Sequence, residues 1–159
     1  MSDINKHWQR WIMSSVYDHF KKGCVPIKMH IDGEDPISAE NFNKIDSFEF
    51  KHLGPDFDPK PSREYEVHLG VNIMVVSTFD PKEPFKHLNN VGLAQSLFTP
   101  CLTVYKYGPY RDVDDKSYLT RLELIAGVKT TAFGNLDPVT RVTRTTVEGH
   151  YFTVIEGVE

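Results

Sequence analysis

The chain has little of what marks several large protein classes. Its 159 residues include only two cysteines, Cys24 and Cys101, which lie far apart and outside any CxxC pair. This spacing argues against a disulfide framework and against a cysteine zinc site, so we predict two free thiols. No apolar run reaches the length of a membrane span, and the first residues lack the basic and apolar segments of a signal peptide. We therefore expect a soluble protein that is made in the cytoplasm and does not contact a membrane.

Motifs of catalysis and of cofactor binding are also missing. The sequence has no GxSxG nucleophile elbow, no glycine-rich phosphate loop, no dinucleotide fingerprint and no HExxH pattern. We therefore expect no enzyme, no cofactor and no bound metal. An active site assembled from distant residues would leave no such motif and stays open at this point.

Histidines are the strongest hint of chemistry, and the chain has seven. His30 and Asp32 lie two residues apart in a predicted strand, so they share a face and would hold a metal if a third ligand came from elsewhere. His68 follows Glu66 on the polar face of another strand, where a solvent-facing ion pair is the simpler interpretation. His87 is expected on the surface of a helix.

Positive charge is not in excess, because the formal net charge is -4. This value argues against a general nucleic-acid binder. Residues 28–66 hold ten acidic and five basic side chains, whereas residues 116–144 hold five basic and two acidic ones. Such polarity would help identical subunits to meet head to tail in a ring, because that contact joins two different surfaces. Solvated surface charge without a partner explains the same distribution equally well.

Residues 63–78 carry the clearest structural signal, an alternation of apolar and polar residues over about twice the length of an ordinary strand. At roughly 3.3 Å per residue, this strand would span on the order of 50 Å. A compact core of this size does not need such a span. We therefore expect the end of the strand to project beyond the core and to reach a neighbouring subunit.

Periodicity and turn residues predict the other elements. Ile4 to Phe20 repeats apolar residues at helical spacing, with both tryptophans on one face. Residues 54–62 contain three prolines and two aspartates and are predicted to form an extended loop. The remaining predicted elements are strands at 25–31, 45–53 and 102–107, a helix at 85–98, and a hairpin of strands at 118–133 and 139–155 with an exposed threonine ladder.

Together these elements predict a single domain over residues 1–159, because the chain is long enough for one hydrophobic core and short for two. The predicted class is α+β. We expect a mainly antiparallel sheet with one very long central strand, a long C-terminal hairpin and two helices packed on one face.

This order of elements resembles the tail terminator, or tail completion, proteins of long-tailed bacteriophages. The resemblance covers most of the chain and rests on the helix from Ile4 to Phe20, the strand REYEVHLGVNIMVV, the helix PFKHLNNVGLAQSLF and the strands LTRLELIAGV and YFTVIE. It implies a virion structural protein that forms a ring, usually a hexamer, at the head-proximal end of the tail. There the ring would stop polymerisation of the tail tube and join the tube to the head connector.

The resemblance also implies the partners, which are further copies of the chain, the tail tube protein and the head-connector protein. The sheet would line a channel through which DNA passes without specific binding, and neighbouring subunits would meet by strand addition or charge pairing. Our candidate subunit-interface residues are a basic group, Arg121, Lys129, Arg141 and Arg144, and an acidic group, Glu34, Asp35, Asp56 and Asp58. Charge reversal at Arg141 and Arg144 is expected to weaken ring formation.

Two alternatives fit the same sequence. One is another virion ring or tube subunit, such as a tail tube or head-closure protein. The other is a small-molecule-binding or hydrolytic α+β domain, in which His30 or His150 would act and a ligand would shift the melting temperature. The pocket would then be lined by the aromatic residues Trp8, Trp11, Tyr65 and Phe152.

Overall fold

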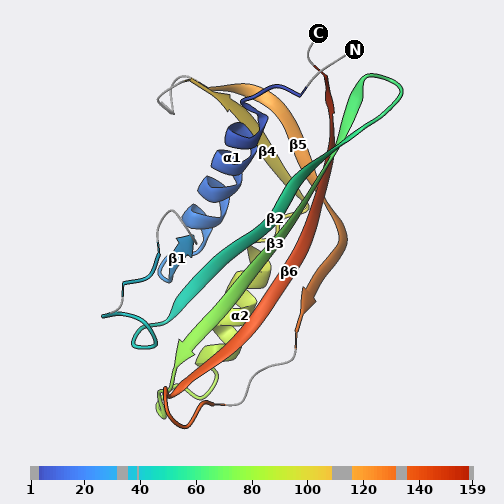
Figure 1. The fold of residues 1–159 in the computed structure, drawn as a ribbon. Helices are drawn as coiled ribbons and strands as arrows, with labels where there is room; N and C mark the ends of the chain where they lie inside the picture. The colour runs from blue at the N-terminus through green and yellow to red at the C-terminus, as the bar shows by residue number, and fades with distance from the viewer. Residues whose placement is uncertain (1–3, 32–35, 39, 109–115, 132–135, 158–159) are drawn as a thin grey trace.

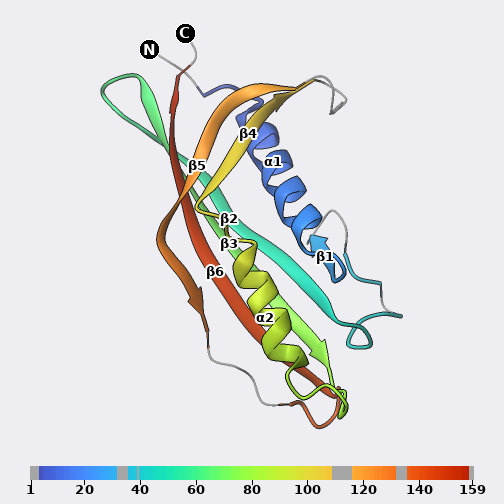
Figure 2. The same cartoon turned by 180° about the vertical axis from the view of Figure 1, so that it is seen from behind.

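The structure is a computed structural model that describes residues 4–31, 36–38, 40–108, 116–131 and 136–157 (Figure 1). In chain order its elements are helix α1 (Trp8–Gly23), strands β1 (Lys28–Ile31), β2 (Ser47–Pro59) and β3 (Glu64–Thr78), helix α2 (Lys86–Ser96), and strands β4 (Cys101–Tyr107), β5 (Lys116–Thr130) and β6 (Val142–Glu156). The strands form one curled sheet in the order β1-β2-β3-β6-β5-β4, and both helices lie on its inner side (Figures 1 and 2). Neither described helix is both long and apolar enough to cross a membrane.

The sheet is mixed, which corrects the predicted mainly antiparallel arrangement. β1 runs parallel to β2, with Met29 opposite Phe48 and Ile31 opposite Phe50, whereas the other described strand pairs are antiparallel. The class is α+β, with more strand than helix. Alternation of apolar residues reports which face of a strand is buried but carries no information on strand direction. The direction of β1 could therefore not be predicted from the alternation of its residues.

β2 extends through the segment that the sequence predicted to be a loop. Its pairing with β3 continues to Pro59, with a bulge between Leu53 and Asp56. β1 accompanies β2 only as far as Phe50, so the rest of β2 is an edge where a proline does not break a pair. Gly54 adopts φ +90° in the bulge, and a Cβ there would lie 2.8 Å from backbone atoms. The prolines and aspartates of this segment thus belong to a strand.

The length of β3 is used mainly within the core, because α2 lies over one half of it (Figure 2) and aromatic side chains of α1 reach toward the other half. At one end, the Trp8 ring of α1 lies 5.6 Å from the Phe57 ring and 5.5 Å from the Tyr65 ring. In the middle, the Phe20 ring at the end of α1 meets the Phe98 ring that follows α2, at 5.3 Å. α2 covers the other half of β3. The expected projection is limited to the turn between β2 and β3, which extends past the helices (Figure 1).

β5 and β6 pair as an antiparallel C-terminal hairpin, and a bulge interrupts them between Ile125 and Lys129. β5 bends at this bulge (Figure 2). Gly149 of β6 faces Phe98, and a Cβ at Gly149 would lie 2.7 Å from a carbon of that ring. Thr145 is buried, so the expected fully exposed threonine ladder is wrong at this position. The hairpin contributes one face to the core, as β3 does.

Both cysteines are free, as predicted from their spacing. Cys24 is buried after the end of α1, and this burial raises the pKa of its thiol. Cys101 is exposed at the start of β4. Two positions so different in exposure fit separate thiols rather than a conserved pair of sulfur ligands.

Leu69→Ala tests whether the long strand belongs to the core. Leu69 is 1% exposed and Leu53 is 70% exposed, so Leu53→Ala is a matched control with the same chemical change. We expect Leu69→Ala to lower the free energy of unfolding by about 2–5 kcal/mol. The control should change it by less than about 0.5 kcal/mol. Urea unfolding followed by tryptophan fluorescence measures both, and equal losses would contradict this burial pattern.

Candidate functional site

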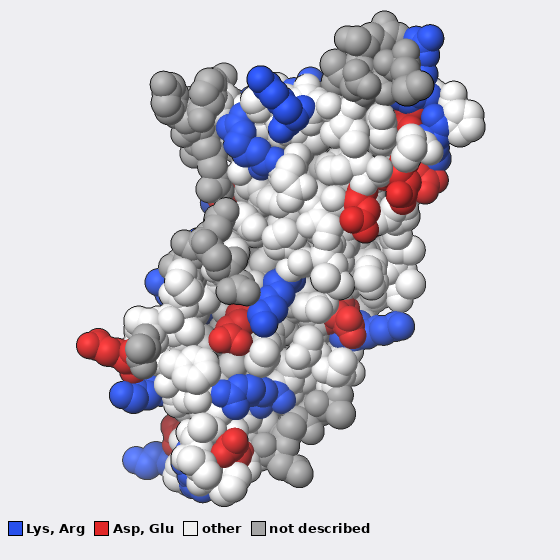
Figure 3. Space-filling model, in the orientation of Figure 1, with Lys and Arg blue, Asp and Glu red and all other residues white. Residues whose placement is uncertain are grey.

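Neither of the two described helices lies on the outer face of the sheet, which forms the candidate functional surface. Strand register places its side chains in rows, and one row runs from Leu53 on β2 through Gly70 and His150 to Ile125 on β5. Leu53 is 70% exposed and Ile125 is 42% exposed. The space-filling view shows a broad uncharged area, with acidic side chains gathered toward the end that carries the β2–β3 turn (Figure 3). Exposed apolar side chains bordered by charge are typical of protein contact surfaces.

The two central strands contribute mostly acidic and neutral side chains to the outer face. Alternation along β3 and β6 places on it Glu64, Glu66, His68, Asn72, Met74, Arg144, Thr146, Glu148, His150, Phe152, Val154 and Glu156. Among these described positions, Arg144 is the one lysine or arginine, and it lies near the start of β6. The middle of the outer face therefore offers few partners for phosphate groups.

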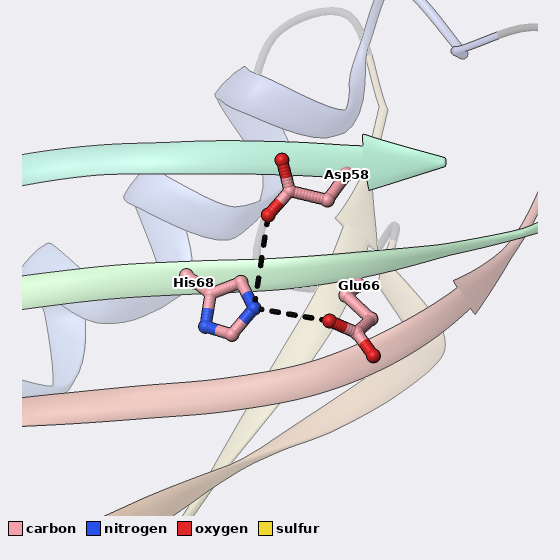
Figure 4. Close-up of side chains that lie close together, drawn as sticks. All are labelled: Asp58, Glu66 and His68. Atoms are coloured by element: carbon pink, nitrogen blue, oxygen red, sulfur yellow. Dashed lines mark hydrogen bonds and ion pairs between the residues drawn. The ribbon is translucent and has the colours of Figure 1, made fainter. Parts of the chain in front are cut away.

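Three titratable side chains meet near the β2–β3 turn: Asp58 from β2, and Glu66 and His68 from β3 (Figure 4). His68 Nε2 lies 3.3 Å from Glu66 Oε2 and 3.8 Å from Asp58 Oδ2. Lys60 Nζ lies 3.0 Å from the other carboxylate oxygen of Glu66. Hydrogen bonds from Lys60 and then from His68 hold the pKa of Glu66 below its ordinary value. The predicted ion pair of His68 with Glu66 is confirmed, whereas Asp58 was missed as its third member because its segment was taken for a loop.

The predicted basic group does not gather in one place. Arg121 and Lys129 are exposed on β5, where Arg121 lies 3.9 Å from Glu123. Arg141 and Arg144 lie near the start of β6, at the far end of the sheet from the β2–β3 turn. There the Arg141 guanidinium lies 4.4 Å from the centroid of the Phe79 ring, and Arg144 donates a hydrogen bond to Asn43. Charge reversal at Arg141 and Arg144 would therefore also disturb contacts within the subunit.

The predicted acidic group is only partly visible. Asp56 and Asp58 are exposed on β2, at the opposite border of the sheet from β5. Glu34 and Asp35 lie outside the described residues, as does Asp32. Asp56 and Asp58 on β2 are separated from Arg121 and Lys129 on β5 by β3 and β6, which corresponds to a distance of roughly 14 Å across the sheet.

Side chains of α1 cover the outer edge of β4. Trp11 Nε1 donates a hydrogen bond to the Tyr107 carbonyl at 3.0 Å, and the Tyr105 N–H donates to Ser15 Oγ at 2.9 Å. These backbone groups would otherwise be free to pair with another strand. At the other border of the sheet, the two prolines and the bulge of β2 hinder pairing in the same way. Contacts with another chain at these positions therefore favour side chains over strand addition.

His30 is the most isolated polar side chain in the core. It is 6% exposed, and neither ring nitrogen has a hydrogen-bond partner among the residues that the structure describes. A crevice of about 160 Å³ lies beside it, lined also by Glu49 and Lys51 from β2. The metal pair that His30 would form with Asp32 and a third ligand is not tested, because Asp32 is outside the described ranges. The crevice has room for water, which would satisfy the imidazole.

His87 is partly buried and bonded, which corrects the expected surface position. It shares hydrogen bonds with Ser77 Oγ and Thr145 Oγ1, each at 2.7 Å. α2 lies on β3 and β6, so this side of the helix faces the sheet. Burial lowers the pKa of the His87 imidazole, while the nearby charge of Asp46 opposes that change.

Asp46 belongs to the same polar network. Thr78 donates to Asp46 Oδ1 through its N–H at 2.8 Å and its hydroxyl at 2.9 Å, and Asn90 donates to Oδ2 at 3.1 Å. Burial by itself raises the pKa of Asp46, but these hydrogen bonds and Lys86 outweigh it, so the pKa lies below its ordinary value. The network joins the end of β3 to α2, and we assign it a structural role.

The aromatic residues proposed to line a ligand pocket do not come together. Trp8 and Tyr65 pack against each other in the core, and Trp11 binds the edge of β4. Phe152 lies on the outer face, where its ring is 5.2 Å from the ring of His68. The sheet separates Phe152 from Trp8, so the predicted pocket is wrong in this form.

Comparison with protein-family models and with curated proteins found no match to this chain. The function must therefore be argued from the surface itself and from the resemblance in element order.

Acidification should weaken the fold through the network at the end of β3. The lowered pKa of His87 means that the unfolded chain takes up a proton more readily than the folded one, so stability falls as the pH drops below 6.5. The lowered pKa of Asp46 adds a further loss at lower pH. We expect the urea midpoint to fall between pH 7.5 and pH 5.5, and to fall less in His87→Gln. His150→Gln, which removes an exposed histidine, should retain the slope of the unchanged protein. If the urea midpoint changes equally with pH in all three proteins, His87 does not contribute to the loss of stability.

Proposed function

We propose that this chain is a ring-forming structural subunit of a virion tail, a tail terminator that caps the head-proximal end of the tail tube and joins it to the head connector. One observation carries the proposal, which is the matched character of two opposite borders of the sheet. Beyond the part that pairs with β1, β2 exposes Leu53 together with Asp56 and Asp58. Beyond the part that pairs with β4, β5 exposes Ile125 together with Lys129, whereas Arg121 lies opposite Thr103 of β4. The resemblance in element order supplies the biological setting.

These two borders suit a contact between identical subunits placed side by side. Leu53 and Ile125 are large apolar side chains that a neighbour would cover, and the charges that follow them have opposite signs, with Asp56 and Asp58 after Leu53 and Lys129 after Ile125. A contact that joins two different borders is heterologous, so repeating it closes a ring when the rotation per subunit fits. Burial of Leu53 and Ile125 would stabilise the contact, whereas the charges would determine how the two subunits align.

The outer face of the central strands supports a channel through which DNA passes. Its described side chains are mainly glutamates and neutral residues, as listed above for β3 and β6. Negative charge on a channel wall repels phosphate groups, so DNA would pass without adhering. In this arrangement the helices would lie away from the channel and the sheet would line it.

Assembly of the purified protein is the first test. We expect closed rings of one size, measured by light scattering over a concentration series and by negative-stain images of each peak. Tubes of unlimited length would instead support a tail tube subunit. A strict monomer at every concentration would contradict self-assembly of the isolated chain.

Charge reversal at the two borders tests the contact itself. We expect Arg121→Glu with Lys129→Glu, and separately Asp56→Lys with Asp58→Lys, to lower the fraction of protein in rings. Mixing the two doubly substituted proteins should restore contacts between the reversed borders, because one then presents acidic and the other basic side chains to the partner border. All samples contain a chelator, so that bound metal does not influence the result.

A matched control reverses two exposed charges on the helix side, Lys6→Glu with Lys22→Glu. The control should assemble as the unchanged protein does. If both border variants also assemble normally, the proposed contact is wrong even if rings form.

A further inference from the structure

The cluster of Asp58, Glu66 and His68 contains one imidazole and two carboxylates that converge on the outer face. Their ligand atoms all lie within 4.8 Å of one another. Asp58 and Glu66 are directly opposite in the β2–β3 register, and His68 is two residues from Glu66 on the same face. The backbone pairing of two strands therefore fixes the relative positions of the three side chains (Figure 4).

An ion pair between His68 and Glu66 does not account for the position of Asp58. His68 Nε2 faces two carboxylates, with Glu66 Oε2 at 3.3 Å and Asp58 Oδ2 at 3.8 Å. A single ring nitrogen donates at most one proton, so it cannot serve both acceptors. Lys60 neutralises Glu66 from the side of Oε1, which leaves Oε2 directed toward the imidazole. Asp58 Oδ2 is thus a second acceptor near the same ring nitrogen, on a side chain that is 66% exposed.

The two distances from His68 Nε2 are close to those between neighbouring ligands of a tetrahedral metal ion. Zn²⁺ binds nitrogen and oxygen ligands at about 2.0–2.2 Å, which places neighbouring ligand atoms roughly 3.3–3.6 Å apart. The two distances from Nε2 lie within a few tenths of an ångström of this range. An imidazole in the ligand set favours a transition metal over Mg²⁺ or Ca²⁺, which prefer oxygen ligands.

We propose that Asp58, Glu66 and His68 form a binding site for a divalent transition metal such as Zn²⁺. The three side chains supply one nitrogen and two oxygens, and their partial exposure leaves the fourth position to water or to a group from another molecule. Lys60 stays beside Glu66 and weakens the site by its positive charge. This inference does not rest on the proposed ring, because the ligands all come from one chain.

Calorimetric titration of the chelator-treated protein with ZnCl₂ tests the site. We expect one Zn²⁺ per chain, together with a rise in melting temperature that grows with Zn²⁺ concentration. His68→Ala and Asp58→Asn should each weaken binding by about tenfold or more and remove the rise in melting temperature. These positions are partly or fully exposed, so the variants should fold, which circular dichroism checks.

Matched controls separate this site from other ligands on the same face. His150→Ala removes another exposed histidine, so it should bind Zn²⁺ as the unchanged protein does. Lys60→Gln should bind more tightly, because it removes the competing positive charge from Glu66. The proposal is overturned if no heat of binding is seen, or if His68→Ala and Asp58→Asn bind as tightly as the unchanged protein. Unchanged or weaker binding in Lys60→Gln would contradict the role of Glu66.

Discussion

The uninterrupted pairing of β3 with β6 is the constraint on which the other features of this molecule depend. The register runs from Glu64 opposite Glu156 to Thr78 opposite Val142 without a bulge. A shift of β3 by one residue relative to β6 would exchange the two faces of β3, so its buried valines would move to the outer face and its glutamates into the core. The same register thus sets the helix-covered core and the acidic outer face. Bulges occur where β2 and β5 pair with this central unit, and they shape the borders without changing its register.

Two short helices cover this long pair, and their junction explains several other features. Phe20 and Phe98 meet where α1 and α2 end, and Gly149 leaves room for Phe98 on β6. Beyond that junction the core becomes polar, with His87 and Asp46 bonded to hydroxyl and amide groups. Buried polar groups require such partners, because an unpaired one costs about 1–3 kcal/mol. The inner side of the sheet therefore has an apolar half and an end at which buried polar side chains are hydrogen-bonded to one another. The outer side is exposed and can contact partners.

Local sequence patterns predicted which face of each helix or strand is buried better than they predicted which strands pair and in which direction. The alternation along residues 63–78 and the helical spacing from Ile4 to Phe20 gave strand and helix, although α1 begins later, at Trp8. Direction and partners depend on contacts distant in sequence, so the parallel β1 and the extension of β2 through Pro59 were missed. The same limit applies to the candidate sites. His68 and Glu66 share one strand and were paired correctly, whereas Asp58 required knowledge of the β2–β3 register.

The edges of the sheet bear on which kind of assembly the proposed contact would form. A free edge strand pairs with the edge of any further copy, and nothing in that interaction limits the number of copies. Here Trp11 and Ser15 occupy backbone groups of β4, and Pro55 and Pro59 remove donors from β2. Association would then depend on contacts between side chains of β2 in one subunit and of β5 in the next. Because each subunit would repeat the same contact, every neighbour would be related to the last by the same rotation. A fixed rotation closes a ring when it divides a full turn and gives a filament when it does not, so the rotation between neighbours decides between the two kinds of assembly.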